Sequence, residues 1–71
     1  MAFNVQETVC VSGAYATSNT MKTTYKLALE HLYTQAKTDL NTDSISYCFI
    51  TIQNEKGQTV KAEQVKPIII T

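Results

Sequence analysis

The stretch Ser44–Val65, SISYCFITIQNEKGQTVKAEQV, is the strongest structural signal in the chain. It opens with a run rich in β-branched and aromatic residues, Ile45–Ile52, and passes through Asn54–Gly57 into a second extended run. β-Branched and aromatic residues favour strands. Asn at the first position of a turn and Gly at the fourth favour a type I turn in which the glycine takes a positive φ. The sequence therefore predicts a β-hairpin around which the remaining elements are arranged.

The predicted turn sets the register of this hairpin. If Asn54 pairs with Gln58, alternation of side chains along each strand assigns every later residue to one of two faces. The first face, the expected floor of the core, carries Ile52 with Val60, Ile50 with Ala62, and Cys48 with Gln64. The second face carries Thr51 with Lys61, Phe49 with Glu63, and Tyr47 with Val65.

The second face is more apolar than a solvated sheet face should be, because it holds two aromatic rings and a valine. We therefore predict that Tyr47, Phe49 and Val65 form an interface with another copy of the chain or with a partner. The alternative is an ordinary open face on which the aliphatic stems of Lys61 and Glu63 cover the rings.

Residues 3–15 alternate in hydrophobicity for most of their length and predict a first strand that Gly13 closes. Glu7 breaks the alternation because it falls on the apolar side. Three explanations stay open: a bulge that resets the phase, a strand end that reaches solvent, or a buried and paired Glu7.

The next element is predicted to be a helix that begins after Ser18 or Asn19 and ends near Asp39 or Leu40, because this interval contains neither Gly nor Pro. Its apolar arc should pack on the sheet. That arc comprises Met21, Tyr25, Ala28, Leu29, Leu32 and Ala36. A second stripe around Leu27 is either a neutral exposed face or a weak second contact surface.

The order strand, helix, strand, strand predicts an α+β fold: a single domain over residues 1–71 with one helix on one face of a three-stranded sheet. A right-handed crossover would make the first strand parallel to the second. Pro67 marks an edge or a kink. Ile68 and Ile70 are then expected to pair within the sheet or with another copy, since an uncovered apolar edge aggregates.

Composition narrows the function classes. The chain has 71 residues, no net charge and only 17% charged residues. Six scattered lysines and no arginine do not make a basic stripe, so we expect no nucleic-acid partner. No segment has the character of a signal peptide or a transmembrane helix, which indicates a cytoplasmic protein without a membrane partner. A short chain with little charge also favours a homodimer or higher oligomer.

The residues that carry chemistry are few and scattered. The chain has one histidine, His31, and two cysteines, Cys10 and Cys48, which we expect to be free thiols in the cytoplasm. Their spacing matches no metal motif and no nucleophile–base pair. We therefore expect no catalytic residues, no metal and no cofactor.

One segment suggests a ligand site. Thr17, Ser18, Thr20 and Lys22 lie where the first strand should lead into the helix. Backbone N–H groups and the helix dipole at such a turn bind anions, although helix capping alone also explains these hydroxyl residues.

We therefore expect a small non-enzymatic interaction protein that self-associates through its sheet: a regulator, inhibitor or accessory subunit, of a size that suits a viral or mobile-element protein. The alternative is a small-ligand binding protein that holds a phosphorylated or anionic metabolite at the strand-to-helix turn or between protomers.

Overall fold

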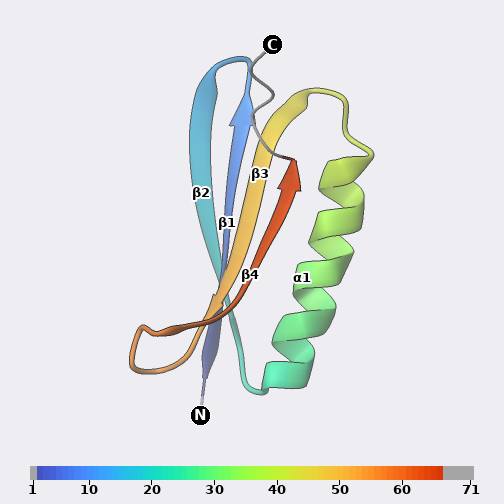
Figure 1. The fold of residues 1–71 in the computed structure, drawn as a ribbon. Coiled ribbons are helices and arrows are strands. Elements are labelled where there is room, and N and C mark those ends of the chain that lie inside the picture. The colour runs from blue at the N-terminus through green and yellow to red at the C-terminus, as the bar shows by residue number, and fades with distance from the viewer. Residues whose placement is uncertain (1, 67–71) are drawn as a thin grey trace.

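The computed structural model describes residues 2–66, which form one four-stranded sheet and one helix packed on one face of it (Figure 1). The elements in chain order are β1 (Phe3–Val11), β2 (Ala14–Lys22), α1 (Tyr25–Leu40), β3 (Ile45–Gln53) and β4 (Thr59–Lys66). The strand order across the sheet is β2-β1-β3-β4, and every neighbouring pair is antiparallel. The predicted α+β class, with one helix on one face, is confirmed.

Strand β2 is the main departure from the sequence prediction of three strands. Ser12 (φ 52°) and Gly13 (φ 82°) both adopt positive φ and form a two-residue turn, as type I′ hairpins require. The chain therefore doubles back along β1 before it enters the helix. This extra reversal makes β3 antiparallel to β1, so the predicted parallel crossover is wrong.

Helix α1 begins later than predicted. Thr24 is its N-cap: the backbone is extended there (φ −131°, ψ 156°), and the side-chain oxygen accepts a hydrogen bond of 3.2 Å from the Leu27 N–H. The predicted start after Ser18 or Asn19 is wrong, because that segment is strand β2. The predicted end near Leu40 is confirmed, and the Asn41 side chain closes the helix by donating to the Lys37 carbonyl.

The β3–β4 turn has the predicted form, but the predicted register does not hold beyond it. The Asn54 N–H donates to the Gln58 carbonyl at 2.9 Å, and Gly57 has φ 79°. A bulge then shifts the pairing by one residue, so that Ile52 pairs with Lys61. A one-residue shift exchanges the faces of a strand. As a result, the side chains of β3 lie on the faces predicted for them, whereas the side chains of β4 lie on the opposite faces.

This reversal corrects one predicted interface residue. Val65 lies at a second irregularity in the register, between Cys48 and Phe49 on β3, and packs against the core on the helix side. It is therefore not a neighbour of Tyr47 and Phe49 on the opposite face. Ile68 and Ile70, the other predicted interface residues, lie outside the described residues.

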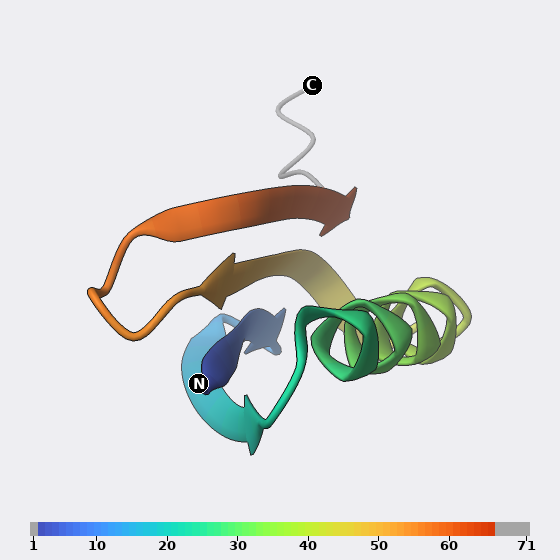
Figure 2. The ribbon, with the colours of Figure 1, turned by 90° about the horizontal axis from the view of Figure 1, so that it is seen from below.

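The core lies between α1 and the two central strands. Seen along the strands, the helix occupies one side of the sheet (Figure 2). The buried cluster of the core comprises Val5 of β1, Ala28 and Leu32 of α1, and Cys48, Ile50 and Ile52 of β3. Within residues 2–66, α1 is the one helix, and it falls short of the length and hydropathy that crossing a membrane requires.

Candidate functional site

The side of the sheet opposite α1, which we call the open face, consists of residues that alternate with the core positions. It comprises Asn4, Gln6, Thr8 and Cys10 of β1, Tyr15, Thr17, Asn19 and Met21 of β2, Tyr47, Phe49, Thr51 and Gln53 of β3, and Thr59, Ala62 and Gln64 of β4. None of these residues is charged. The predicted positions of Tyr47 and Phe49 on this face are confirmed, and both side chains are half-buried.

Side-chain amides on the open face are hydrogen-bonded to one another across three strands. The Asn4 Nδ2 group donates to Asn19 Oδ1 at 2.9 Å and to Gln53 Oε1 at 3.2 Å. The Gln53 Nε2 group in turn donates to Gln6 Oε1 at 3.4 Å. Asn4 Oδ1 has no partner among residues 2–66. The bonds that are made still lower the cost of covering these amides with another surface, compared with burying fully unpaired ones.

Aromatic side chains gather at the other end of the open face. Cys10 pairs with Tyr15 on one side and with Tyr47 on the other. The two rings meet edge to face, with centroids 5.8 Å apart, so they lie over the cysteine between them, which is only 6% exposed. Such rigid rings are typical anchors of protein interfaces.

The centre of the open face holds an unsatisfied polar group. Thr51 pairs with Gln6 of β1 and with Ala62 of β4, and it is 8% exposed. Its hydroxyl finds no hydrogen-bond partner within residues 2–66. A buried hydroxyl without a partner is costly, so this position would gain from a donor or acceptor supplied by another molecule.

The face beneath α1 carries the charges that the open face lacks. Lys61 and Glu63 are on this side because of the bulge in β4, and they lie 3.7 Å apart. The Lys66 ammonium group donates to the Thr42 carbonyl at 2.7 Å and to the Ile45 carbonyl at 3.0 Å. These lysines therefore connect β4 to the helix side of the molecule.

A buried polar cluster, Glu7–Asp39–Cys48, lies between the helix and the central strands. The Cys48 thiol donates to Asp39 Oδ2 at 3.1 Å. Burial, together with the neighbouring Asp39 carboxyl, raises the pKa of Glu7 to about 7 and the pKa of Cys48 to about 12. Among the described residues, no donor faces Glu7 Oε2. The raised pKa favours a protonated Glu7 below about pH 7, and a protonated carboxyl carries its own donor.

This cluster settles the open question about Glu7. The register is regular at Glu7 and shifts only between Cys10 and Val11, so Glu7 faces the helix as a paired, partly buried carboxyl. Its partner Asp39 was missed, although it follows Leu32 and Ala36 on the same helical stripe. The donor atoms of the three residues lie within 4.8 Å of one another, close enough to hold a metal ion.

The cysteines do not form a pair. Both carry free, buried thiols. Cys10 lies on the open face, whereas Cys48 lies beneath α1. Because the sheet separates them, a bridge within one chain is excluded by geometry.

The predicted anion site rests on a turn that the structure does not contain. Thr17, Ser18 and Thr20 lie in the middle of β2, and the N-terminus of α1 follows only after Thr24. Thr17 faces the open side, while Ser18 faces Glu7 across the strands, with 3.5 Å between the Ser18 Oγ donor and Glu7 Oε1. The helix dipole therefore does not act on these hydroxyls, and the geometric basis of the prediction is wrong.

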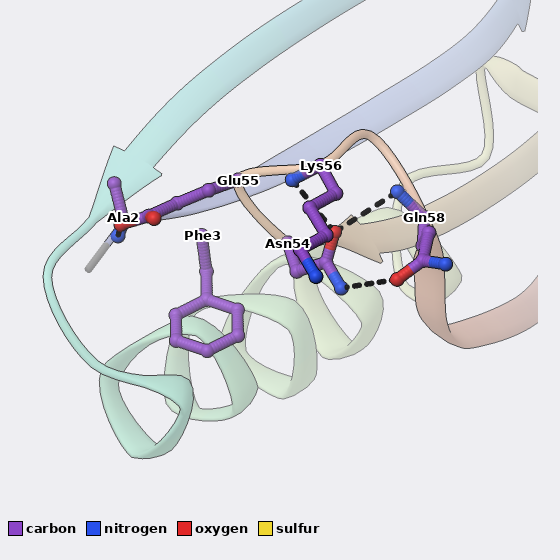
Figure 3. A pocket seen from close by; sticks show the side chains of 6 residues that line it. All are labelled: Ala2, Phe3, Asn54, Glu55, Lys56 and Gln58. Carbon is purple, nitrogen blue, oxygen red and sulfur yellow. Dashed lines mark hydrogen bonds between the residues drawn. The ribbon is translucent and has the colours of Figure 1, made fainter.

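A cavity of about 240 Å³ lies beside the β3–β4 turn (Figure 3). The Asn54 side chain organises this turn: its Oδ1 accepts from the backbone N–H groups of Lys56 and Gln58. The Phe3 ring lines the cavity and meets Tyr25 of α1 edge to face. Glu55 Oε1 accepts from the Ala2 N–H at 2.7 Å. We interpret this hollow as the product of the turn and its contact with the N-terminal end of the described chain.

Comparison with protein-family models, curated proteins and solved structures finds no match to this chain. The candidate site therefore rests on geometry and composition alone.

Proposed function

We propose that this protein is a small non-enzymatic interaction protein, a regulator, inhibitor or accessory subunit, that binds a second copy of itself through the open face. The observation that carries the proposal is the complete lack of charge on that face.

The number of charged side chains on a sheet face determines how well water solvates that face. An exposed antiparallel face normally carries polar and charged side chains that keep it solvated. Here all six acidic and six basic residues of the chain lie elsewhere. Two such faces can meet without desolvating any charge, which is the largest cost of association between polar surfaces.

The dimensions of the face suit a stable contact. Four strands at about 4.8 Å spacing and nine residues at about 3.4 Å rise give roughly 19 by 30 Å, or about 570 Å² per copy. Two copies would then bury about 1,100 Å², just above the roughly 1,000 Å² expected of a specific interface. Tyr15, Tyr47 and Phe49 supply the aromatic anchors.

The test places charge on the open face without disturbing the fold. Ala62 and Gln64 are exposed residues of β4 that face outward next to Thr51 and Phe49. In Ala62→Lys/Gln64→Lys, each copy would bring two lysines into the interface. We expect the dissociation constant of the face-to-face contact to rise by about tenfold or more, measured by sedimentation velocity.

The matched control is Thr34→Lys/Thr38→Lys, which adds the same charge on exposed positions of α1. Its association should equal that of the wild type. A control that dissociates as strongly as the β4 variant would assign the effect to net charge and would overturn the proposed surface.

A further inference from the structure

Among residues 2–66, no strand pairs with the outer edge of β2. Strand β2 is nine residues long, lies at the end of the strand order, and pairs with β1 without any irregularity. It contains no proline, and Lys22 at its last position is its one charge. Native edge strands are normally blunted by prolines, charges or bulges. The absence of these devices from β2 leaves this edge suited to pairing with another strand.

The hairpin turn determines which backbone groups face outward. In a two-residue turn the flanking residues, Val11 and Ala14, exchange hydrogen bonds, and the pattern then alternates along an antiparallel pair. Ala16, Ser18 and Thr20 accordingly point their N–H and C=O groups toward β1. The outward-pointing groups belong to the residues between them: Tyr15, Thr17, Asn19 and Met21.

We propose that β2 pairs in antiparallel fashion with β2 of a second copy, about a two-fold axis at Ser18. This register is the one that pairs all nine residues of each strand. It sets Ser18 opposite Ser18, Thr17 opposite Asn19, Ala16 opposite Thr20, Tyr15 opposite Met21, and Ala14 opposite Lys22. The outward-pointing groups of both strands then meet as hydrogen-bonded pairs.

The side chains of β2 are compatible with pairing to β2 of a second copy. In this register, each Lys22 lies opposite an alanine, and the two lysines stand at opposite ends of the pair, so no like charges meet. Each Tyr15 lies beside a Met21 thioether on the open face, a favourable sulfur–aromatic contact. An isologous contact of this kind also closes after two copies and does not propagate into a fibre.

This inference deepens the proposed self-association and rests on it for the identity of the partner. The edge of β2 is a different surface from the open face. The substitutions that test the open face lie on β4, at the opposite edge of the sheet from β2. Edge pairing extends the sheet, and face contact stacks one sheet on another. Used together, the two contacts give an assembly of four chains.

Cross-linking at the proposed axis tests the edge by itself. In Ser18→Cys the two facing Cα atoms would lie about 4.5 Å apart, within the disulfide range of about 4.4–6.8 Å. In the control, Thr20→Cys, the two copies of the residue are offset by four positions, about 14 Å. Cys10 and Cys48 are 6% and 0% exposed and do not compete.

We expect Ser18→Cys to form a covalent dimer about tenfold or more faster than Thr20→Cys under mild oxidation, read by intact mass under non-reducing conditions. Equal rates for the two variants would overturn the pairing. The outcome is separate from the face proposal: Ser18→Cys should still cross-link in the Ala62→Lys/Gln64→Lys background.

A second variant tests the backbone contact without new chemistry. Thr17→Pro removes an N–H group that points away from β1, so the ladder within the chain stays intact. Thr17→Val is the matched control, since it loses the same hydroxyl but keeps the N–H group. We expect the assembly to shrink to half its mass for Thr17→Pro only. A Thr17→Pro variant that assembles like Thr17→Val would contradict the edge pairing.

Discussion

The two faces of the sheet carry opposite kinds of side chain, and the distribution is the reverse of what solvent exposure alone would produce. The covered face includes Glu7, Lys61, Glu63 and Lys66 around its apolar core, while the open face has no charge. Lys66 is held by hydrogen bonds, Lys61 and Glu63 form an ion pair, and burial raises the pKa of Glu7. The comparison supports the proposal that the open face contacts protein more than water.

The largest expected effect contrasts neighbouring residues of β3 that face opposite sides. Ile50→Ala removes a fully buried side chain from the core beneath α1. We expect it to lower the free energy of unfolding by about 3 kcal/mol, measured by urea denaturation at fixed chain concentration.

Thr51→Val is the matched change on the open face. It removes a hydroxyl that has no partner within the described residues while keeping the shape of the side chain. The free energy of unfolding should stay within about 1 kcal/mol of the wild type, or rise. A loss as large as that of Ile50→Ala would mean that the Thr51 hydroxyl is satisfied and essential.

The second effect is the pH dependence of the free energy of unfolding that arises from Glu7 on the covered face. The pKa of Glu7 is raised from 4.5 to about 7, mainly by burial. The folded chain therefore holds a proton that the unfolded chain releases above pH 4.5, and stability falls as the pH rises from about 4.5 to about 7.

Glu7→Gln should flatten this part of the pH profile, since glutamine does not titrate. Allowing for solvent screening of a partly exposed carboxyl, we expect the wild type to lose about 1–2 kcal/mol across this interval, measured by urea denaturation at several pH values. A wild-type profile that rises over the same interval would contradict the raised pKa of Glu7.

The third effect is kinetic and compares the two thiols. Cys10 lies under two tyrosine rings on the open face, whereas Cys48 lies beneath the helix with its pKa raised to about 12. Tyr15→Ala should uncover Cys10 and speed its reaction with a thiol reagent by about tenfold, while Cys48 stays unreactive. Mass spectrometry of the labelled peptides distinguishes the two sites, and labelling of Cys48 at the faster rate would refute the assignment of faces.

Local signals in the sequence were enough for part of this fold. The dense β-branched run of β3, the Asn54–Gly57 turn and the end of α1 followed from propensity and turn chemistry. The same reasoning correctly placed Tyr47 and Phe49 on the face away from the helix.

Strand β2 was missed because its residues send a mixed signal. Ala14–Lys22 is rich in Ser, Thr and Asn, which serve equally as caps, turns and strand residues. Its apolar residues do not alternate with polar ones, since most of its residues are exposed on both faces. The β4 bulge was hidden for another reason: a single unpaired residue, Val60, leaves no mark in the hydrophobic pattern, yet it reverses the faces of the strand.

The candidate site was predictable to a similar extent. The apolar patch could be seen from the hairpin alone, but the absence of charge on the whole face required the positions of β1 and β2. The pairing of Glu7 with Asp39 needed the tertiary arrangement, because a helix and a distant strand supply the two carboxyls.

The central claim is that the open face is covered by a second copy through a contact without charges. The most direct measurement is the mass of the wild-type protein by light scattering at micromolar concentration, at ionic strengths of about 0.1 M and about 1 M. We predict a mass of at least two chains at both, because salt does not screen an uncharged contact. A mass of one chain at both ionic strengths would contradict the account.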